Sequence, residues 1–100
     1  MAFDIDTIYK ALANPVRREI LTFLREPRVH FPRQPLSFDD GVCASEIAAL
    51  LSVSQSTVSV HLATLRQAEL VTTTRIGQWV FFKRNDAVIE AFLGALHREL

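Results

Sequence analysis

The sequence predicts a mainly α-helical domain with one small β-hairpin. Apolar residues recur at helical spacing near both ends of the chain and through its middle. A Ser-Val-Ser segment at residues 52–54 separates two of these helical patterns. β-Branched and aromatic residues then flank a turn that contains glycine. Two short helices joined by a tight turn and followed by a hairpin form a winged helix-turn-helix, here in the order α-α-α-α-β-β-α.

The length and composition narrow the class of protein. One hundred residues fit a single domain over residues 1–100. A chain this short buries only about two-thirds of its surface on folding, so dimerisation would stabilise it. No run of about 18 apolar residues exists to span a membrane, and the early Asp4 does not fit a signal peptide. One cysteine, Cys43, cannot form an internal disulfide. We therefore expect a cytoplasmic domain with no membrane partner.

Two amphipathic helices are predicted near the N-terminus. The first spans residues 4–13, with Asp4 or Asp6 as its cap. The second begins at Pro15, because proline favours the first position of a helix. Their apolar stripes contain Ile5, Ile8 and Leu12 in the first helix and Val16, Ile20, Phe23 and Leu24 in the second.

Residues 26–41 break the helical pattern. Three prolines and the turn sequence Asp39-Asp40-Gly41 punctuate this segment. Sixteen residues form a long connection for a compact domain. We expect an ordered, extended loop that is attached to the body by its apolar residues, Phe31, Leu36 and Phe38.

The central helices and the hairpin follow this loop. Helices are predicted over residues 44–51 and from Gln55 to about Ala68, with Ser54 as the cap of the second. Strands are expected over residues 70–74 and 79–83, with a turn at 75–78. Asn85 or Asp86 should cap a final helix with a wide apolar stripe.

The stretch SVSQSTVSVHL, residues 52–62, carries five hydroxyl groups and no charge. At 100° per residue, Val58, His61, Leu62 and Leu65 share the inner face of its helix, and small polar residues face outward. Small side chains let a helix enter the major groove, where Gln can pair with adenine and Val60 can contact a thymine methyl group. The alternative is a solvated face on an ordinary helical hairpin. The predicted DNA-binding residues are Ser54, Gln55, Ser56, Thr57, Ser59, Val60, His61, Arg66, Arg75 and Gln78.

The charges are unevenly distributed although they sum to zero. Residues 55–84 carry four basic side chains and one acidic side chain, whereas residues 85–100 carry one basic and three acidic side chains. A basic middle and an acidic tail indicate that one face meets a polyanion. Chance in a short chain is the alternative explanation.

The segments KALANPVRREILTFL, ASEIAALLSVSQSTVSVHLATLRQAELV and TTTRIGQWVFFKRN together resemble the ArsR/SmtB family of bacterial winged-helix repressors. The resemblance covers residues 8–100. It implies a homodimer that pairs through its first and last helices and reads an inverted-repeat DNA site with its fourth helix. The sequence departs from the family at Val60, where many relatives have Arg, and at Ser52, where many have Gly. A positive φ at Ser52 would cost up to about 1 kcal/mol.

The apolar stripes of the first and last helices are too wide for a 100-residue monomer to bury. We expect them to form the dimer interface, where burial stabilises by roughly 25 cal/mol per Å². The predicted interface residues are Ile5, Ile8, Ile89, Phe92, Leu93 and Leu96.

The sensor sites that the resemblance implies are incomplete. Cys43 aligns with one cysteine of the arsenical site, but Ser45 stands where the second would be. Asp86 aligns with the first ligand of the zinc site, but Val88 replaces its histidine. A single thiolate is a poor site for a soft metal, so Cys43 is only a weak metal candidate. We expect no metal and no cofactor. Small-molecule sensing near residues 26–41 and the absence of any sensing both stay open, and the sequence favours the second.

No enzyme motif is present, such as a Gly-rich phosphate loop or His-Glu-x-x-His. The sequence thus predicts a DNA-binding transcriptional regulator, in the form of a repressor that occludes a promoter. Two alternatives stay open: a winged helix that binds a partner protein, and a thiol or metal sensor that acts through Cys43.

Overall fold

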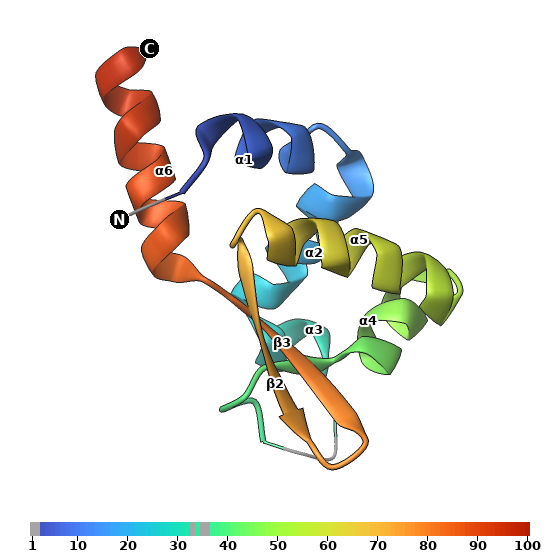
Figure 1. The fold of residues 1–100 in the computed structure, drawn as a ribbon. Helices are drawn as coiled ribbons and strands as arrows, with labels where there is room; N and C mark the ends of the chain where they lie inside the picture. The colour runs from blue at the N-terminus through green and yellow to red at the C-terminus, as the bar shows by residue number, and fades with distance from the viewer. Residues whose placement is uncertain (1–2, 33, 35–36) are drawn as a thin grey trace.

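The computed structural model describes residues 3–32, 34 and 37–100. It has the predicted winged helix-turn-helix architecture, with a helical body and a hairpin that extends from it (Figure 1). The elements in chain order are α1 (Ile5–Leu12), α2 (Pro15–Arg25), α3 (Pro27–His30), β1 (Val42–Cys43), α4 (Ala44–Leu51), α5 (Gln55–Gln67), β2 (Val71–Ile76), β3 (Trp79–Arg84) and α6 (Asp86–Glu99).

Side-chain caps begin the helices where the sequence predicts them. Asp4 accepts from the backbone N–H of Asp6, and Ser54 accepts from that of Thr57 at 3.2 Å. Asn85 caps α6 by accepting from the N–H of Val88. Hydrogen bonds from Thr7 and from nearby backbone groups lower the pKa of Asp4 below its usual 3.8.

The core forms where the N-terminal helices meet α5. Val58, Leu62 and Leu65 of α5 are buried as predicted, and the outward residues of that helix are exposed. Burial of three apolar side chains at helical spacing fixes which face of α5 is left to solvent. Other fully buried side chains are Ile8, Ile20 and Ile47.

The sheet has three antiparallel strands in the order β1-β3-β2, rather than the predicted hairpin alone. β1 pairs Val42 with Phe82 of β3. The predicted turn at 75–78 is too long: Arg75 and Ile76 continue β2 and pair with Val80 and Trp79. The loop of the hairpin is therefore only Gly77 and Gln78, and Gly77 supplies a positive φ of 61°.

The segment 26–41 is not wholly extended, because its first residues form the one-turn helix α3. Phe31 is buried and Phe38 packs against the core, as expected for this segment, whereas Leu36 lies outside the described residues. Gln34 attaches the segment to the sheet. Its Nε2 donates to the Gly41 carbonyl at 3.1 Å, and its Oε1 accepts from the N–H of Cys43 at 3.0 Å.

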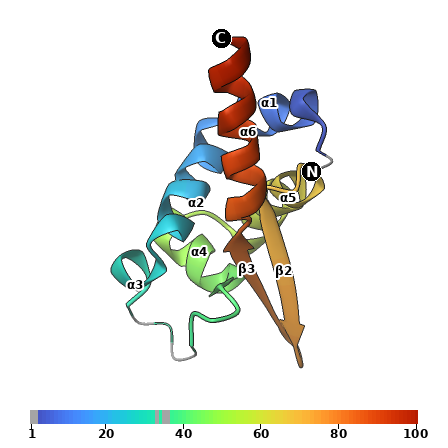
Figure 2. The same ribbon diagram turned by 90° about the vertical axis from the view of Figure 1, so that its left-hand side faces the viewer.

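β3 leads directly into α6, and the hairpin and α6 extend in opposite directions from the body (Figures 1 and 2). The C-terminal end of α6 projects beyond the other helices. In the described part of the chain, no single helix is long and apolar enough to cross a membrane. The pair α4 and α5, bent by 113°, meets that criterion only when the two are taken together.

Two of the predicted dimer-interface residues belong to the protomer core. Ile8 is completely buried, so it cannot contact a partner. Phe92 is 5% exposed and packs edge-on against Tyr9, with ring centroids 5.6 Å apart. Both residues therefore have their neighbours within the same chain, and their place in a dimer interface stays a prediction. Leu93, in contrast, is 55% exposed.

Candidate nucleic-acid interface

Hydroxyl groups cluster at the N-terminus of α5. Ser54 Oγ lies 2.8 Å from Thr57 Oγ1 and 3.1 Å from Ser56 Oγ. This arrangement follows from the cap, since a serine that accepts from the third residue of the helix brings the first-turn hydroxyls together. The remaining backbone N–H groups at this end attract an anion.

The outward face of α5 is small and uncharged over its first two turns. Gln55, Ser56, Ser59 and Val60 are all exposed. Val60 is 66% exposed. Such a face can approach another surface closely, because Ser56, Ser59 and Val60 have short side chains.

Two adjoining hollows separate α5 from the hairpin. The first, of about 430 Å³, places Gln55 and Ser59 opposite Gln78 and Trp79. The second, of about 360 Å³, places Ser59 and Arg66 opposite Arg75. The structure therefore brings together five of the predicted site residues, which come from two separate elements: Gln55, Ser59, Arg66, Arg75 and Gln78.

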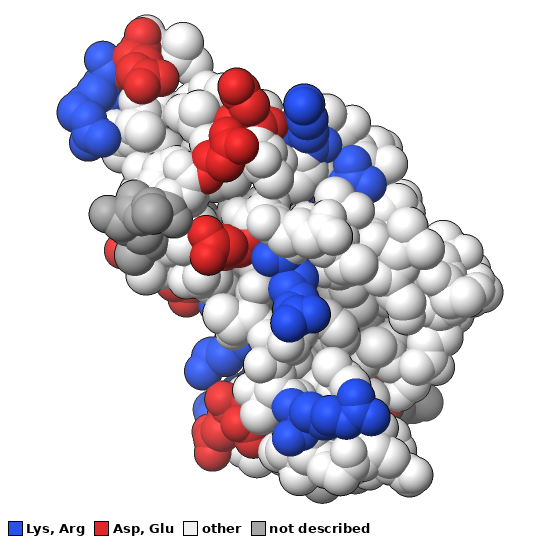
Figure 3. Space-filling model, in the orientation of Figure 1, with Lys and Arg blue, Asp and Glu red and all other residues white. Residues whose placement is uncertain are grey.

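The surface over these hollows is mostly uncharged, with basic patches over the C-terminal part of α5 and over the hairpin (Figure 3). Arg66 is the only basic residue of α5, and Arg75 lies near the end of β2. Both side chains are exposed. Cations on either side of a polar helix face can hold the backbone of a polyanion while the helix contacts its interior.

His61 has a different position from the rest of the predicted site. It is half-buried, and its Nδ1 lies 3.3 Å from Nη1 of Arg17 in α2. Because arginine only donates, Nδ1 of His61 is the acceptor in this contact. His61 therefore packs on α2, and its contact with DNA stays a prediction.

Two exposed apolar residues form a pair at the tip of the hairpin, which was not predicted from the sequence. Ile76 and Trp79 pair across the strands and are 49% and 47% exposed. The alternation of side chains along β3 could have placed Trp79 on the opposite face from Val80. The predicted turn at residues 75–78 contains Ile76, so the pair was not predicted from the sequence.

Cys43 is buried at the start of α4, and its Sγ lies 3.3 Å from Ser45 Oγ. Within residues 3–32, 34 and 37–100, no three His, Cys, Asp or Glu side chains gather into a group that could hold a metal ion. The absence of a metal-controlled response stays a prediction.

The winged fold and the exposed recognition face agree with the similarity of this chain to known proteins. Residues 39–73 match the family described as bacterial regulatory protein, arsR family. The transcriptional regulator YbzH of Bacillus subtilis is 37% identical over 95 residues, which cover 93% of this chain and 95% of YbzH. The chain belongs to the arsR family. The resemblance found in the sequence is thereby confirmed, and this family consists of transcriptional regulators.

Solved structures support the same assignment. An ArsR-like transcriptional regulator from Rhodococcus sp. RHA1 superposes with a TM-score of 0.70 at 26% identity, covering 94% of this chain and 76% of that protein. HlyU from Vibrio cholerae superposes with a TM-score of 0.64 at 33% identity, covering 92% of this chain and 86% of HlyU. In this fold, α5 is the second helix of the helix-turn-helix, and β2 and β3 form the wing.

Proposed function

We propose that this arsR-family protein is a homodimer that binds an inverted-repeat DNA site and represses transcription by occluding a promoter. The observation that supports DNA binding best is the pair of adjoining hollows. These hollows place polar residues of α5 beside Arg66 and Arg75. A polar helix face beside flanking cations suits one strand of a DNA backbone and the adjacent major groove.

Each part of the surface has a separate role in this proposal. Gln55 reads adenine at a base edge, and Val60 contacts a thymine methyl group. Ser54, Ser56, Thr57 and the N-terminus of α5 hold a phosphate. Arg66, Arg75 and Gln78 contact the DNA backbone or groove from the C-terminal part of α5 and from the wing.

The dimer uses the stripe of α6 that the protomer leaves uncovered. Leu93 and Leu100 are exposed, and Ile89 and Leu96 are partly exposed on the same side of the helix. Ile5 at the start of α1 is also only partly buried. A dimer related by a two-fold axis requires two half-sites about one helical turn apart.

The test begins with selection of bound duplexes from a random pool. The selected site should have dyad symmetry, and its absence would contradict the dimeric model of recognition. Gln55→Ala should then cost on the order of 1–3 kcal/mol and relax the preference at one base in each half-site.

Arg75→Ala should weaken binding to all sequences alike and should reduce the salt slope by roughly one unit, because one phosphate contact is lost. Arg98→Ala is the matched control, since Arg98 lies at the C-terminal end of α6. Its loss should leave both the affinity and the salt slope unchanged.

The exposed pair of Ile76 and Trp79 favours a second candidate function. Apolar residues exposed together at a hairpin tip are typical of a protein-binding surface. In that case binding to duplex DNA would be weak and the partner would be a protein, whose contacts need not release counterions. A steep salt dependence of duplex binding separates the two functions.

The direction of regulation needs its own measurement. HlyU of Vibrio cholerae, which is 33% identical over 91 residues, is described as a transcriptional activator. Repression by this chain would appear as reduced transcript from a promoter that contains the selected site, when the protein is added to purified polymerase. Increased transcript would show activation instead.

A further inference from the structure

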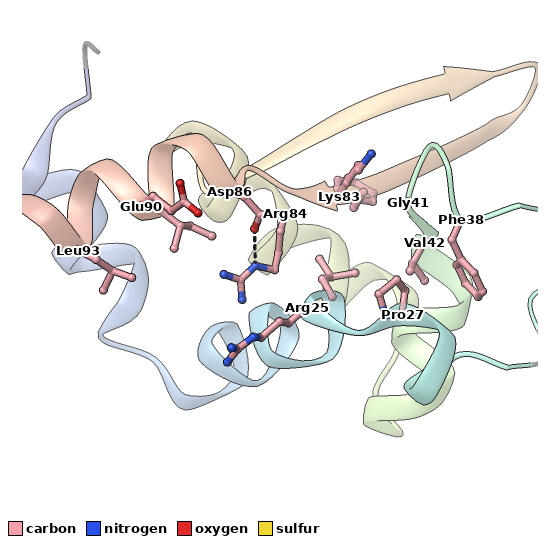
Figure 4. Close-up of a pocket in the computed structure, with 13 residues that line it drawn as sticks. Arg25, Pro27, Phe38, Gly41, Val42, Lys83, Arg84, Asp86, Glu90 and Leu93 are labelled. Carbon is pink, nitrogen blue, oxygen red and sulfur yellow. Dashed lines mark hydrogen bonds and ion pairs between the residues drawn. The ribbon is translucent and has the colours of Figure 1, made fainter.

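A pocket of about 510 Å³ lies on the other side of the wing, between α2 and α6 (Figure 4). Its walls come from the C-terminal end of α2, from β3 and from the N-terminal half of α6, and Phe38 and Gly41 close its far end. This volume is within the range of sites that hold small organic molecules. None of the residues assigned to DNA contact lines it.

Two cationic and two anionic side chains line this pocket: Arg25 and Arg84, and Asp86 and Glu90. Lys83 also lines it, but its ammonium group points away from the arginines and donates to the Asp39 carbonyl at 3.1 Å (Figure 4). Figure 4 shows Arg25 and Arg84 directed into the same space between α2 and α6.

Arg25 and Arg84 differ in how many of their N–H donors already form hydrogen bonds within the protein. Arg84 donates from Nε to Asp86 at 3.1 Å and from Nη1 to the Leu21 carbonyl at 3.4 Å, so it is held in place and retains free donors. The guanidinium of Arg25 makes no hydrogen bond or ion pair with any residue that the structure describes. Its planar pair of N–H groups is therefore available for bidentate contact with a carboxylate.

The rest of the pocket is apolar. Leu24, Ile89 and Leu93 lie beside the arginines, and Val42 and Phe82 line the deeper part toward the sheet. Leu93 is 55% exposed in the protomer, so a ligand that covers it would remove apolar surface from water. Inorganic phosphate would leave this apolar surface uncovered.

We propose that this pocket is a binding site for an organic monocarboxylate with an apolar body. The carboxylate accepts from Arg25 and from the free donors of Arg84, and the apolar body covers Ile89 and Leu93. This site is separate from the DNA-binding surface. It shares Ile89 and Leu93 with the proposed dimer interface, so ligand binding and dimerisation through these two side chains exclude each other.

The test is calorimetric titration of the full chain, without DNA, with straight-chain carboxylates from acetate to octanoate and with their neutral amides. Affinity for the carboxylates should increase by up to about fourfold with each added methylene until the pocket is filled. The amides should bind at least about tenfold more weakly, because they lack the charge that a guanidinium recognises.

Arg25→Gln should weaken carboxylate binding at least about tenfold, and Arg25→Lys should recover only part of it, because lysine cannot make the bidentate contact. Arg25 is exposed, so both variants should keep the circular dichroism spectrum of the parent. Arg66→Gln on α5 is the control and should bind as the parent does. In NMR spectra, octanoate should shift the methyl signals of Ile89 and Leu93.

Three results would each overturn the proposal. The first is the absence of saturable binding at any chain length, as would occur if a partner protomer filled the pocket. The second is equal binding of carboxylates and amides. The third is undiminished binding by Arg25→Gln. Because no DNA is present, none of these results bears on DNA recognition, and a failure of DNA recognition would leave this test unchanged.

Discussion

Gly41 and Gly77 both have a positive φ, yet their surroundings differ. At Gly41, with φ of 106°, an added Cβ would collide with the backbone carbonyl of Phe82, whereas at Gly77, with φ of 61°, nothing lies within 4 Å. Gly41→Ala should therefore destabilise the domain by about 2–5 kcal/mol, through strain and collision together. Gly77→Ala should cost only about 1–2 kcal/mol, from the left-handed backbone alone. Urea unfolding of both variants measures the difference, and equal losses would contradict this account.

Ser52 is a second residue whose backbone conformation suits glycine. It ends α4 in the left-handed region, with φ of 56° and ψ of 38°, so the predicted penalty for serine applies. Ser52→Gly should raise the free energy of unfolding by a few tenths to about 1 kcal/mol. Ser56→Gly is the matched control. Because Ser56 lies within a helix, this variant should have a free energy of unfolding about 0.5–1 kcal/mol lower than the parent. A Ser52→Gly variant that unfolds at lower urea concentration than the parent would contradict this prediction.

Which residues sequence reasoning could place depends on the range of their contacts. Ser54 and Asn85 were predicted as caps because each bonds to a residue only three positions away. The contact between Arg17 and His61 spans 44 positions, and neither residue has a pattern that indicates it. For the same reason His61 was placed in the DNA-contacting set on the basis of its helix alone.

Arg17 connects its own helix α2 to α1 and α5 through hydrogen bonds. Its Nε donates to the Ala11 carbonyl at 2.6 Å and its Nη2 to the Lys10 carbonyl at 3.2 Å, both in the last turn of α1. The Ala11 carbonyl cannot bond to the residue four positions later, because Pro15 has no N–H. Arg17→Ala should therefore destabilise the domain by about 1.5–3 kcal/mol.

Thermal and urea unfolding of Arg17→Ala, compared with Arg66→Ala, provide the measurement. Arg66 is exposed on α5, so its truncation should change the free energy of unfolding by no more than about 0.5 kcal/mol. Equal stabilities of the two variants would show that the bonds of Arg17 to α1 and α5 contribute nothing net.

Among the elements, α4 begins and ends at the predicted residues, Ala44–Leu51, because its apolar spacing and the following turn are local signals. The strand β1 was missed. Two residues, Val42–Cys43, are too short for alternation to reveal, and their strand exists only through pairing with β3, some 40 residues later. The predicted hairpin turn was two residues too long, because Arg75 and Ile76 belong to β2. Both residue types occur in strands and in turns, so the sequence pattern does not fix this boundary.

At the scale of the whole molecule, the apolar stripes of α1 and α6 were correctly found, but they meet two different neighbours. Ile8 and Phe92 turn into the protomer core, whereas Leu93 and Leu100 remain exposed. A helical stripe shows that a face is buried, and it does not show which surface buries it. That distinction needs the three-dimensional arrangement, in which α6 projects beyond the body (Figures 1 and 2).

The division of the α6 stripe leads to a prediction about assembly. Leu93→Asp places a charge on an exposed position, so it should leave the protomer folded and convert a dimer into monomers. Phe92→Asp places a charge beside Tyr9 in the core, so it should unfold the protomer itself. Sedimentation at micromolar concentration measures the mass, and circular dichroism measures the fold. If the wild-type protein is a monomer under these conditions, the dimer proposal is wrong. If Leu93→Asp has the same mass as the wild-type dimer, the interface does not include this face of α6.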